Sequence, residues 1–242
     1  MKVAVISDIH ANYHALEAVL ADVTAEKPDE VWCLGDVVGY GPEPNRCCRL
    51  VAEHADLCLA GNHDLAVLGV LPVDEFNGDA ATAVAWTQSV LTEESRRFLE
   101  PLMPALARNG AGLFHGSPVD PVWDYVLSED GARASMESVS ASLVIVGHSH
   151  VALRISYEDG AIAGGLAYRG DEVDLSAPRW LLNPGSVGQP RGGDPRAAWL
   201  TIDFDAGRAR FRRTAYPIEL TQREIRVAGL PEALAVRLGL GQ

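Results

Sequence analysis

Short clusters of aspartate, asparagine and histidine are the residues of this sequence best suited to chemistry. They read Asp8-Ile9-His10, Gly35-Asp36, Gly61-Asn62-His63-Asp64 and Gly147-His148-Ser149-His150, with His115-Gly116 as a fifth candidate. Carboxylate and amide oxygens mixed with imidazole nitrogens suit pairs of divalent cations. Two such cations about 3.5 to 4 Å apart can bridge a hydroxide and neutralise charge on an attacked phosphate. The clusters therefore predict metal-dependent phosphoester hydrolysis.

Each cluster follows a short apolar run that is typical of a buried β-strand. The runs cover residues 2–6, 30–34, 57–60, 112–114 and 143–146. Polar residues at the carboxyl ends of strands converge at one edge of the sheet in open α/β folds, and ligands bind there. We therefore expect five strands to deliver the clusters to one place.

The order of the remaining elements predicts an α/β fold. Apolar residues at helical spacing indicate helices over residues 14–26, 45–53, 79–91, 93–100 and 128–139. After residue 150 the pattern changes to two hairpins, 151–157 with 161–166 and 198–204 with 208–216, and to a closing helix pair over 221–238. We expect a four-layer αββα sandwich, with two mixed β-sheets packed face to face, helices outside each, and the metal site at the carboxyl ends of strands.

Length and composition agree with one such unit. The chain has 242 residues with 48% hydrophobic content, and no linker or repeat divides it, so we expect a single domain over residues 1–242. No run approaches the about 18 to 20 apolar residues of a membrane helix, and the amino terminus enters a strand without a signal pattern. We therefore expect a cytoplasmic protein without a membrane partner. The cysteines lack zinc-site spacing and are interpreted as reduced core residues.

The formal net charge of −13 bears on partners. An acidic field repels polyanions, so duplex nucleic acid is not an expected partner. A local basic run at Arg208, Arg210, Arg212 and Arg213 falls on an expected hairpin strand, where alternate spacing puts three arginines on one face. We interpret it as a solvated outer face.

The ordered motifs resemble those of the calcineurin-like metallophosphoesterase superfamily. Asp-x-His, Gly-Asp, Gly-Asn-His-Asp, His-Gly and Gly-His-x-His follow one another between residues 8 and 150. The segment 183–191, Asn-Pro-Gly-Ser-Val-Gly-Gln-Pro-Arg, is similar to that of the small stand-alone bacterial and archaeal members. A single Asp-x-His or His-x-His occurs by chance, whereas five motifs in order, each after a predicted strand, are specific.

The resemblance implies which residues bind metal. The first ion would be held by Asp8, His10 and His150, and Asp36 would bridge both ions. The second ion would be completed by Asn62, His115 and His148. His148 and His150 project to the same side only if their segment is extended, so each could face a different ion. The ions would be divalent transition metals, with Mn, Fe, Zn, Ni and Co all suited to these ligands.

The resemblance further implies that His63 contacts the phosphate and protonates the leaving oxygen, which suits an imidazole with a pKa near neutrality. Asp64 either orients that imidazole by a hydrogen bond or only caps the helix that follows. For phosphate binding we consider Asn12, close to His10. We also consider Arg191, in a glycine- and proline-rich loop, whose alternative is an exposed loop charge.

One departure from the superfamily narrows the substrate. In its protein Ser/Thr phosphatases the Gly-Asp motif continues to an Asp-Arg-Gly, whereas here Gly35-Asp36 continues as Val37 to Gly41. We therefore predict hydrolysis of small phosphodiesters or phosphomonoesters rather than phosphoproteins. An inactive binding scaffold and a nuclease are the alternatives. A zinc hydrolase of the metallo-β-lactamase type is disfavoured, because Val151-Ala152-Leu153 follows His150 where that type needs an Asp-His.

Overall fold

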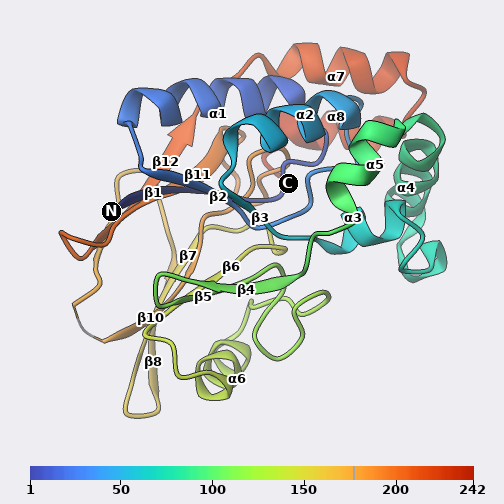
Figure 1. The fold of residues 1–242 in the computed structure, drawn as a ribbon. Helices are drawn as coiled ribbons and strands as arrows, with labels where there is room; N and C mark the ends of the chain where they lie inside the picture. The colour runs from blue at the N-terminus through green and yellow to red at the C-terminus, as the bar shows by residue number, and fades with distance from the viewer. Residues whose placement is uncertain (177) are drawn as a thin grey trace.

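The protein is built on two mixed β-sheets that lie face to face (Figure 1). A computed structural model describes residues 1–176 and 178–242. Within these residues each sheet has six strands, in the order β3-β2-β1-β11-β12-β9 in the first and β4-β5-β6-β10-β7-β8 in the second. Helices lie outside both sheets, so the predicted four-layer αββα arrangement is confirmed.

The parallel strands of both sheets end at the edge where the motifs lie. The first sheet contains β1 (Lys2–Ile6), β2 (Glu30–Cys33), β3 (Leu57–Cys58), β9 (Glu172–Asp174), β11 (Ala197–Asp203) and β12 (Arg208–Thr214). The second contains β4 (Ala105–Arg108), β5 (Ala111–Phe114), β6 (Leu143–Val146), β7 (Leu153–Glu158), β8 (Ala161–Leu166) and β10 (Arg179–Asn183). Strand β1 is parallel to β2 and β2 to β3, and β6 is parallel to β5 and β10.

The helices divide into three groups in space (Figure 1). On the outer side of the first sheet lie α1 (Tyr13–Glu26) and α2 (Pro44–His54), with α7 (Ile218–Val227) beside α1 and α8 (Glu232–Leu240) packed on α7. A separate group beyond the end of the sheets comprises α3 (Asn62–Val67), the 3-10 helix η1 (Val73–Glu75), α4 (Gly78–Val90) and α5 (Glu93–Leu99). The second sheet is covered by α6 (Glu129–Ser138).

Alternation along the strands explains why the layers stack. Val3 and Val5 of β1 point into the core between the two sheets, whereas Ala4 and Ile6 point into the core beneath the helices. A third apolar cluster, which includes Met136 of α6, fills the space outside the second sheet. Each strand near the middle is thus buried on both faces, and its carboxyl end is fixed rigidly.

Several elements depart from the sequence expectations. The hairpin strand predicted over 151–157 is observed as β7, Leu153–Glu158, so it begins two residues later than expected. The short strands β4 and β9 were not predicted; β4 is an edge strand that exposes Leu106, and β9 is only 3 residues long. The helix expected after Asp64 is α3, which already begins at Asn62. Among the described residues, no helix combines the length and the hydropathy that crossing a membrane requires.

Candidate metal centre

The motif residues lie in the turns that leave the carboxyl ends of the strands. Asp8 follows β1, Asp36 follows β2, His115 comes directly after β5, and His148 follows β6. Asn62 and His63 open α3 instead of lying in a loop. The side chains brought together here are all 3% exposed or less: Asp8, His10, Asp36, Asn62, His63, His115, His148 and His150. The strands therefore deliver the clusters to one buried place.

The backbone of this region is strained at the candidate ligands themselves. The left-handed φ angles lie between 50° and 60° at Asp8, His10, Asp36, His148 and His150. Such conformations cost on the order of 1–3 kcal/mol each for residues other than glycine and cluster at functional sites. Segment 148–150 is therefore not extended, which was the condition for His148 and His150 to project to the same side. Its tight turn nevertheless places His148 and His150 in different ligand groups.

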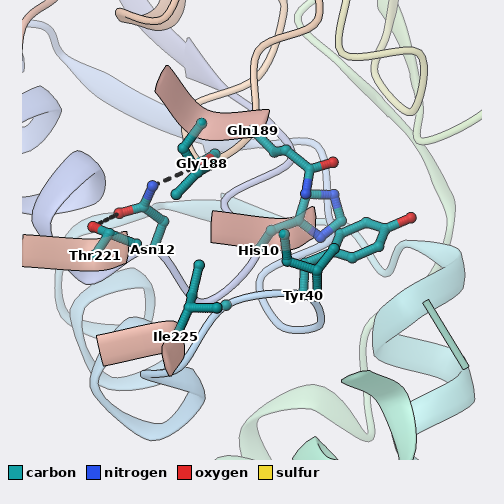
Figure 2. A pocket seen from close by; sticks show the side chains of 10 residues that line it. His10, Asn12, Tyr40, Gly188, Gln189, Thr221 and Ile225 are labelled. Carbon is teal, nitrogen blue, oxygen red and sulfur yellow. Dashed lines mark hydrogen bonds between the residues drawn. The ribbon is translucent and has the colours of Figure 1, made fainter. Parts of the chain in front are cut away.

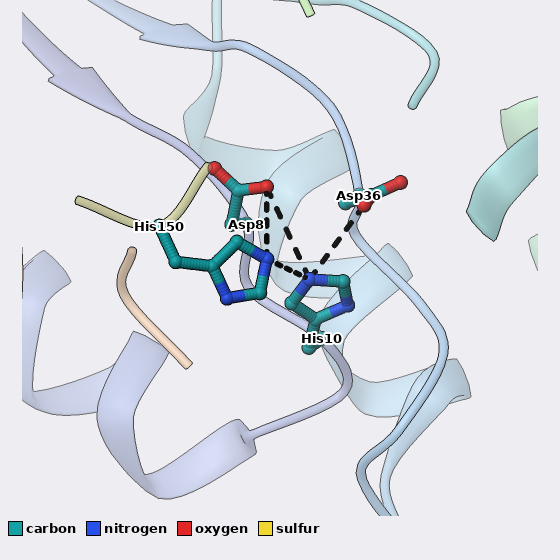
Figure 3. Close-up of side chains that lie close together, drawn as sticks. All are labelled: Asp8, His10, Asp36 and His150. Atoms are coloured by element: carbon teal, nitrogen blue, oxygen red, sulfur yellow. Dashed lines mark hydrogen bonds and ion pairs between the residues drawn. The ribbon is translucent and has the colours of Figure 1, made fainter. Parts of the chain in front are cut away.

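One ligand group consists of Asp8, His10, Asp36 and His150, whose donor atoms lie within 4.8 Å of one another (Figure 3). The Nε2 atoms of His10 and His150 are 2.9 Å apart. His10 Nε2 lies 3.6 Å from Asp36 Oδ2, and His150 Nε2 lies 3.4 Å from Asp8 Oδ1. Two imidazoles and two carboxylates thus converge on a volume the size of a cation.

A second group consists of Asp36, His115 and His148, again within 4.8 Å. His115 Nε2 lies 3.5 Å from Asp36 Oδ2 and 3.2 Å from the amide oxygen of Asn62. Asp36 therefore belongs to both groups. Its Oδ1 atom accepts a hydrogen bond of 2.9 Å from the backbone N–H of His63, which fixes the carboxylate and leaves Oδ2 for the imidazoles.

Buried polar atoms without partners gather at this point. In the described part of the chain they include Asp8 Oδ1, Asp36 Oδ2, His63 Nδ1 and His148 Nε2. Leaving one buried polar atom unpaired costs about 1–3 kcal/mol, so several at one point call for a common partner. Carboxylate oxygen and imidazole nitrogen are both ligands of divalent transition metals, so the residues fit such ions.

Backbone carbonyl groups fix the orientation of several imidazoles. The Nδ1 atoms that face carbonyl oxygens are those of His10 with Val38 at 3.2 Å, His115 with Leu34 at 2.9 Å, and His150 with Gln189 at 2.7 Å. An Nδ1–H that donates to a carbonyl leaves the Nε2 lone pair free, which is the arrangement that metal-ligating histidines adopt.

Burial and neighbouring charge shift the pKa values of the candidate ligands. Burial lowers the pKa of His10 and His150 well below the ordinary value and that of His148 to about 3. Burial, reinforced by Asp36, raises the pKa of Asp8 to about 7. For Asp36 itself burial also favours the neutral acid, but the nearby histidines outweigh it and lower the pKa. His10, His148 and His150 are thus neutral beside the ionised Asp36, which is the state that binds a cation. For His115 burial also opposes the charged form, but Asp36 outweighs it and raises the pKa to about 9, so a cation must displace a proton from this imidazole.

The carboxylate of Asp64 forms hydrogen bonds with the backbone and not with the imidazole of His63. Its carboxylate accepts hydrogen bonds from the N–H groups of Gly61 at 3.0 Å, Val37 at 3.3 Å and Val38 at 3.0 Å. The helix-capping alternative is therefore the one observed, and the other alternative, a hydrogen bond to His63, does not form in the described structure. The reason is geometric, since the carboxylate already joins the turn after β2 to the start of α3.

The side-chain amide of Asn12 is also engaged in hydrogen bonds with other parts of the protein (Figure 2). Its amide nitrogen donates to the carbonyl of Gly188 at 2.8 Å and to the hydroxyl of Tyr216 at 3.2 Å. Its amide oxygen accepts from the N–H of Ala15 at 3.2 Å and from the hydroxyl of Thr221 at 2.8 Å. All of its hydrogen-bonding capacity is used in capping α1 and holding neighbouring segments. The expected contact between Asn12 and phosphate is therefore not supported.

Arg191 borders the centre and is half-buried. Its backbone N–H donates to the carbonyl of His150 at 3.2 Å, and its Nη2 donates to Gln189 Oε1 at 3.0 Å. Its Nε is buried without a partner in the described structure. These contacts do not fit the alternative of an exposed loop charge.

Aromatic side chains that the sequence did not predict as part of the site pack against the histidines. The ring of His63 packs against Tyr40 and Phe76, with centroids 4.4 and 4.9 Å apart. Tyr125 stacks on His148 at 3.9 Å. These aromatic residues stand singly in turns, so neither periodicity nor motif spacing marks them. They surround the catalytic candidate with apolar surface.

Comparison with known proteins shows which family model matches this chain. The model of the "Calcineurin-like phosphoesterase superfamily domain" matches residues 1–206. An uncharacterized protein of Methanocaldococcus jannaschii is 36% identical over 247 residues, which cover 99% of this chain and 98% of that protein. A symmetrical bis(5'-nucleosyl)-tetraphosphatase of Nitrosococcus oceani is 30% identical over 139 residues. That match covers 55% of this chain and 49% of the tetraphosphatase, about half of each.

Solved structures agree with the family. The crystal structure of a metallophosphoesterase from Sphaerobacter thermophilus superposes with a TM-score of 0.91 at 40% identity, over 100% of this chain and 99% of that one. A hypothetical protein from Pyrococcus horikoshii superposes with a TM-score of 0.82 over 100% and 98% of the two chains. Its identity is 20%, so this second likeness concerns the fold alone.

Proposed function

Because the chain belongs to the calcineurin-like phosphoesterase superfamily, we propose that it hydrolyses small phosphodiesters or phosphomonoesters at a centre of two divalent transition-metal ions. The observation that carries the proposal is the position of Asp36, whose carboxylate belongs to both groups of potential ligands. A carboxylate shared in this way can hold two cations at the separation that phosphoester hydrolysis uses.

The proposed ligands divide between the two ions as their positions suggest. Asp8, His10 and His150 would join Asp36 at the first ion, and Asn62, His115 and His148 would join it at the second. Ions held there would supply a hydroxide nucleophile at neutral pH and neutralise charge on the phosphate. The mixture of imidazole, carboxylate and amide suits Mn, Fe, Zn, Ni or Co.

We assign His63 to the phosphate and to the leaving oxygen. Its Nδ1 is buried without a partner in the described structure, and its ring is held between Tyr40 and Phe76. Burial lowers the pKa of His63 to about 4, so the ring is neutral at pH 7 in the free protein. An anionic phosphate beside it favours the protonated form, which is the form that can donate a proton.

We infer that the substrates are small and not macromolecular. We assign Arg191 to a phosphate oxygen, because its Nε has no partner in the described structure and its backbone N–H contacts the proposed ligand His150. The Asp-Arg-Gly of the protein phosphatases is missing, and the net charge is −13. The tetraphosphatases that resemble half of the chain act on nucleotides by their names, which supports nucleotide-like phosphoesters.

The alternatives have less support. An inactive scaffold would be expected to have lost ligands, whereas both ligand groups are intact. A nuclease would need free basic surface, but three of the four arginines of β12 are paired with acids. Arg208 and Arg210 each lie 3.7 Å from a carboxylate oxygen of Glu172, and Arg212 pairs with Glu26.

A panel of phosphate monoesters and diesters, assayed with metal-stripped protein refilled with one ion at a time, tests the proposal. We expect no turnover without metal and turnover of at least one small ester after refilling. Full activity after stripping would contradict the metal role. Binding without turnover for every ester and every ion would favour the scaffold.

A further inference from the structure

Two arginines from distant parts of the chain meet at one acceptor beside the metal centre. Arg191 donates from Nη2 to Gln189 Oε1 at 3.0 Å, and Arg237 of α8 donates from Nη1 to the same oxygen at 3.4 Å. Both side chains are half-buried. In the described part of the chain neither guanidinium group forms an ion pair with a carboxylate. This arrangement differs from that of Arg208, Arg210 and Arg212 of β12, which have acidic partners.

Two like charges held together in this way are unfavourable unless an anion compensates them. Burial together with the charge of Arg191 lowers the pKa of Arg237, which reflects that repulsion. A guanidinium group carries five N–H donors, and among the described residues the hydrogen bonds to Gln189 use only one on each of the two side chains. Arg191 Nε is buried with no partner at all in the described structure. The pair therefore has both the charge and the donors to bind an anion.

The arginine pair lies close to the proposed metal ligands. The carbonyl of Gln189 is bonded to His150 Nδ1 at 2.7 Å, and the backbone N–H of Arg191 donates to the carbonyl of His150. Gln189 also lines a small cavity together with Tyr40 and His10 (Figure 2). That cavity holds about 10 Å³, which is room for a water molecule and not for a phosphate. An anion would therefore bind outside it.

Tyr40 connects the arginine pair to the catalytic candidate. Tyr40 lines the same small cavity as Gln189, whose side-chain oxygen accepts hydrogen bonds from both arginines. The ring of Tyr40 packs on His10 and His63 at 4.7 and 4.4 Å. A group bound by the arginines would thus lie next to the phosphate that His63 contacts.

We propose that Arg191 and Arg237 form a second anion site, which binds a phosphate group adjacent to the one that is hydrolysed. The preferred ligands would then be phosphoesters with two or more phosphates in a row, of which a nucleoside diphosphate is an example. The planar donors of arginine match the oxygens of a phosphate group and bind it in pairs. The identity of the neighbouring phosphate rests on the proposed function, whereas binding of an anion by the pair does not.

Calorimetry with two anions that cannot be hydrolysed tests the proposal. Methylphosphonate carries one phosphonate group and methylenediphosphonate carries two, and each is titrated into the metal-loaded wild type and variants. We expect Arg237→Gln to weaken binding of methylenediphosphonate by about 10- to 100-fold, the range for hydrogen bonds to a charged group. Binding of methylphosphonate should change by less than about threefold. Arg237→Lys should restore part of the loss.

The matched control is Arg223→Gln, which removes the same charge from an exposed position on α7. It should leave both affinities unchanged, and because free metal chelates the diphosphonate equally in all samples, the difference between variants reports the site. Equal affinities of wild type and Arg237→Gln for the diphosphonate, with folding confirmed by melting temperature, would overturn the proposal. Absence of ester hydrolysis with every metal would overturn the proposed function but leave this comparison valid.

Discussion

Several side chains at the centre use two atoms: one is held by the backbone, and the other faces the remaining candidate ligands. The imidazoles of His10, His115 and His150 are held by carbonyl groups on one side, so that the other nitrogen faces the centre. Asp36 is held in the same way: one carboxylate oxygen accepts a hydrogen bond from a backbone N–H, and the other lies among the imidazoles. A ligand fixed in this way loses little conformational freedom when it binds a cation.

For His63 we expect that replacement by alanine preserves the metals but lowers turnover by roughly two to four orders of magnitude, as for a general acid or transition-state contact. The loss should be smaller for a nitrophenyl ester, whose leaving group needs no proton. Steady-state kinetics on an activated and an unactivated ester, with metal content measured in parallel, check this. Equal losses on both esters would show that His63 binds phosphate without protonating the leaving group.

Asp64 should matter for folding rather than for chemistry. Asp64→Ala leaves the N–H groups of Gly61, Val37 and Val38 buried without an acceptor, so the free energy of unfolding should fall by about 2–4 kcal/mol. Chemical denaturation of the metal-free protein measures it, with the exposed Asp74→Ala as the control. A variant of unchanged stability whose turnover falls as far as that of His63→Ala would restore the orienting role.

At the scale of elements, the turns after the strands pack so closely that a methyl group does not fit. The Cβ of an alanine at position 188 would lie 1.8 Å from the carbonyl oxygen of Ile9, in the turn between Asp8 and His10. The loop that contains Gly188 also carries Gln189, which holds His150. Backbone contact between these two turns therefore sets the geometry of the first ligand group.

Gly188→Ala should consequently destabilise the protein by about 2–4 kcal/mol and reduce metal occupancy, since either turn must move. Gly78→Ala at the start of α4, where nothing lies within 4 Å of the added Cβ, should leave both unchanged. Thermal melting and elemental analysis of both variants provide the test. Full metal occupancy in a stable Gly188→Ala would show that the contact does not position the ligands.

Local sequence patterns predict the strands of the site but not all of the turns that follow them. Apolar runs mark β1 and β6 with their observed bounds, and the polar residues after them converge as expected. The left-handed turns at His148 and His150 were not predictable, because only a few per cent of residues other than glycine adopt this conformation and no local pattern marks these two. Arg237 was not predicted as a site residue, because only the fold brings α8 to Gln189 and no local spacing in the sequence marks this arginine.

For the whole molecule, we expect the net charge to limit the class of substrate. With a charge of −13, long-range repulsion should oppose polyanions, and attraction of phosphate should be confined to the proposed metals and nearby arginines. The specificity constant kcat/KM should therefore be highest for a small diester and low for a phosphopeptide and for duplex DNA, compared at one salt concentration. A preference for DNA that steepens as salt is lowered would favour the nuclease and direct attention to β12.

The two sheets contribute different parts of the centre, so its assembly is a property of the whole fold. Asp8 and Asp36 come from the first sheet, and His115 and His148 come from the second. Metal bound between them should stabilise the folded chain, because an ion that binds only the native state shifts the equilibrium toward it. The shared carboxylate of Asp36 is the point on which both ligand groups depend.

Elemental analysis of the wild type and Asp36→Asn, combined with turnover of one small phosphoester, tests the central claim most directly. Two divalent transition-metal ions per wild-type chain are the expected result. In Asp36→Asn both should bind more weakly and most activity should be lost, because an amide supplies no comparable negative charge. Two tightly bound ions and near wild-type turnover in Asp36→Asn would contradict a centre built on this shared carboxylate.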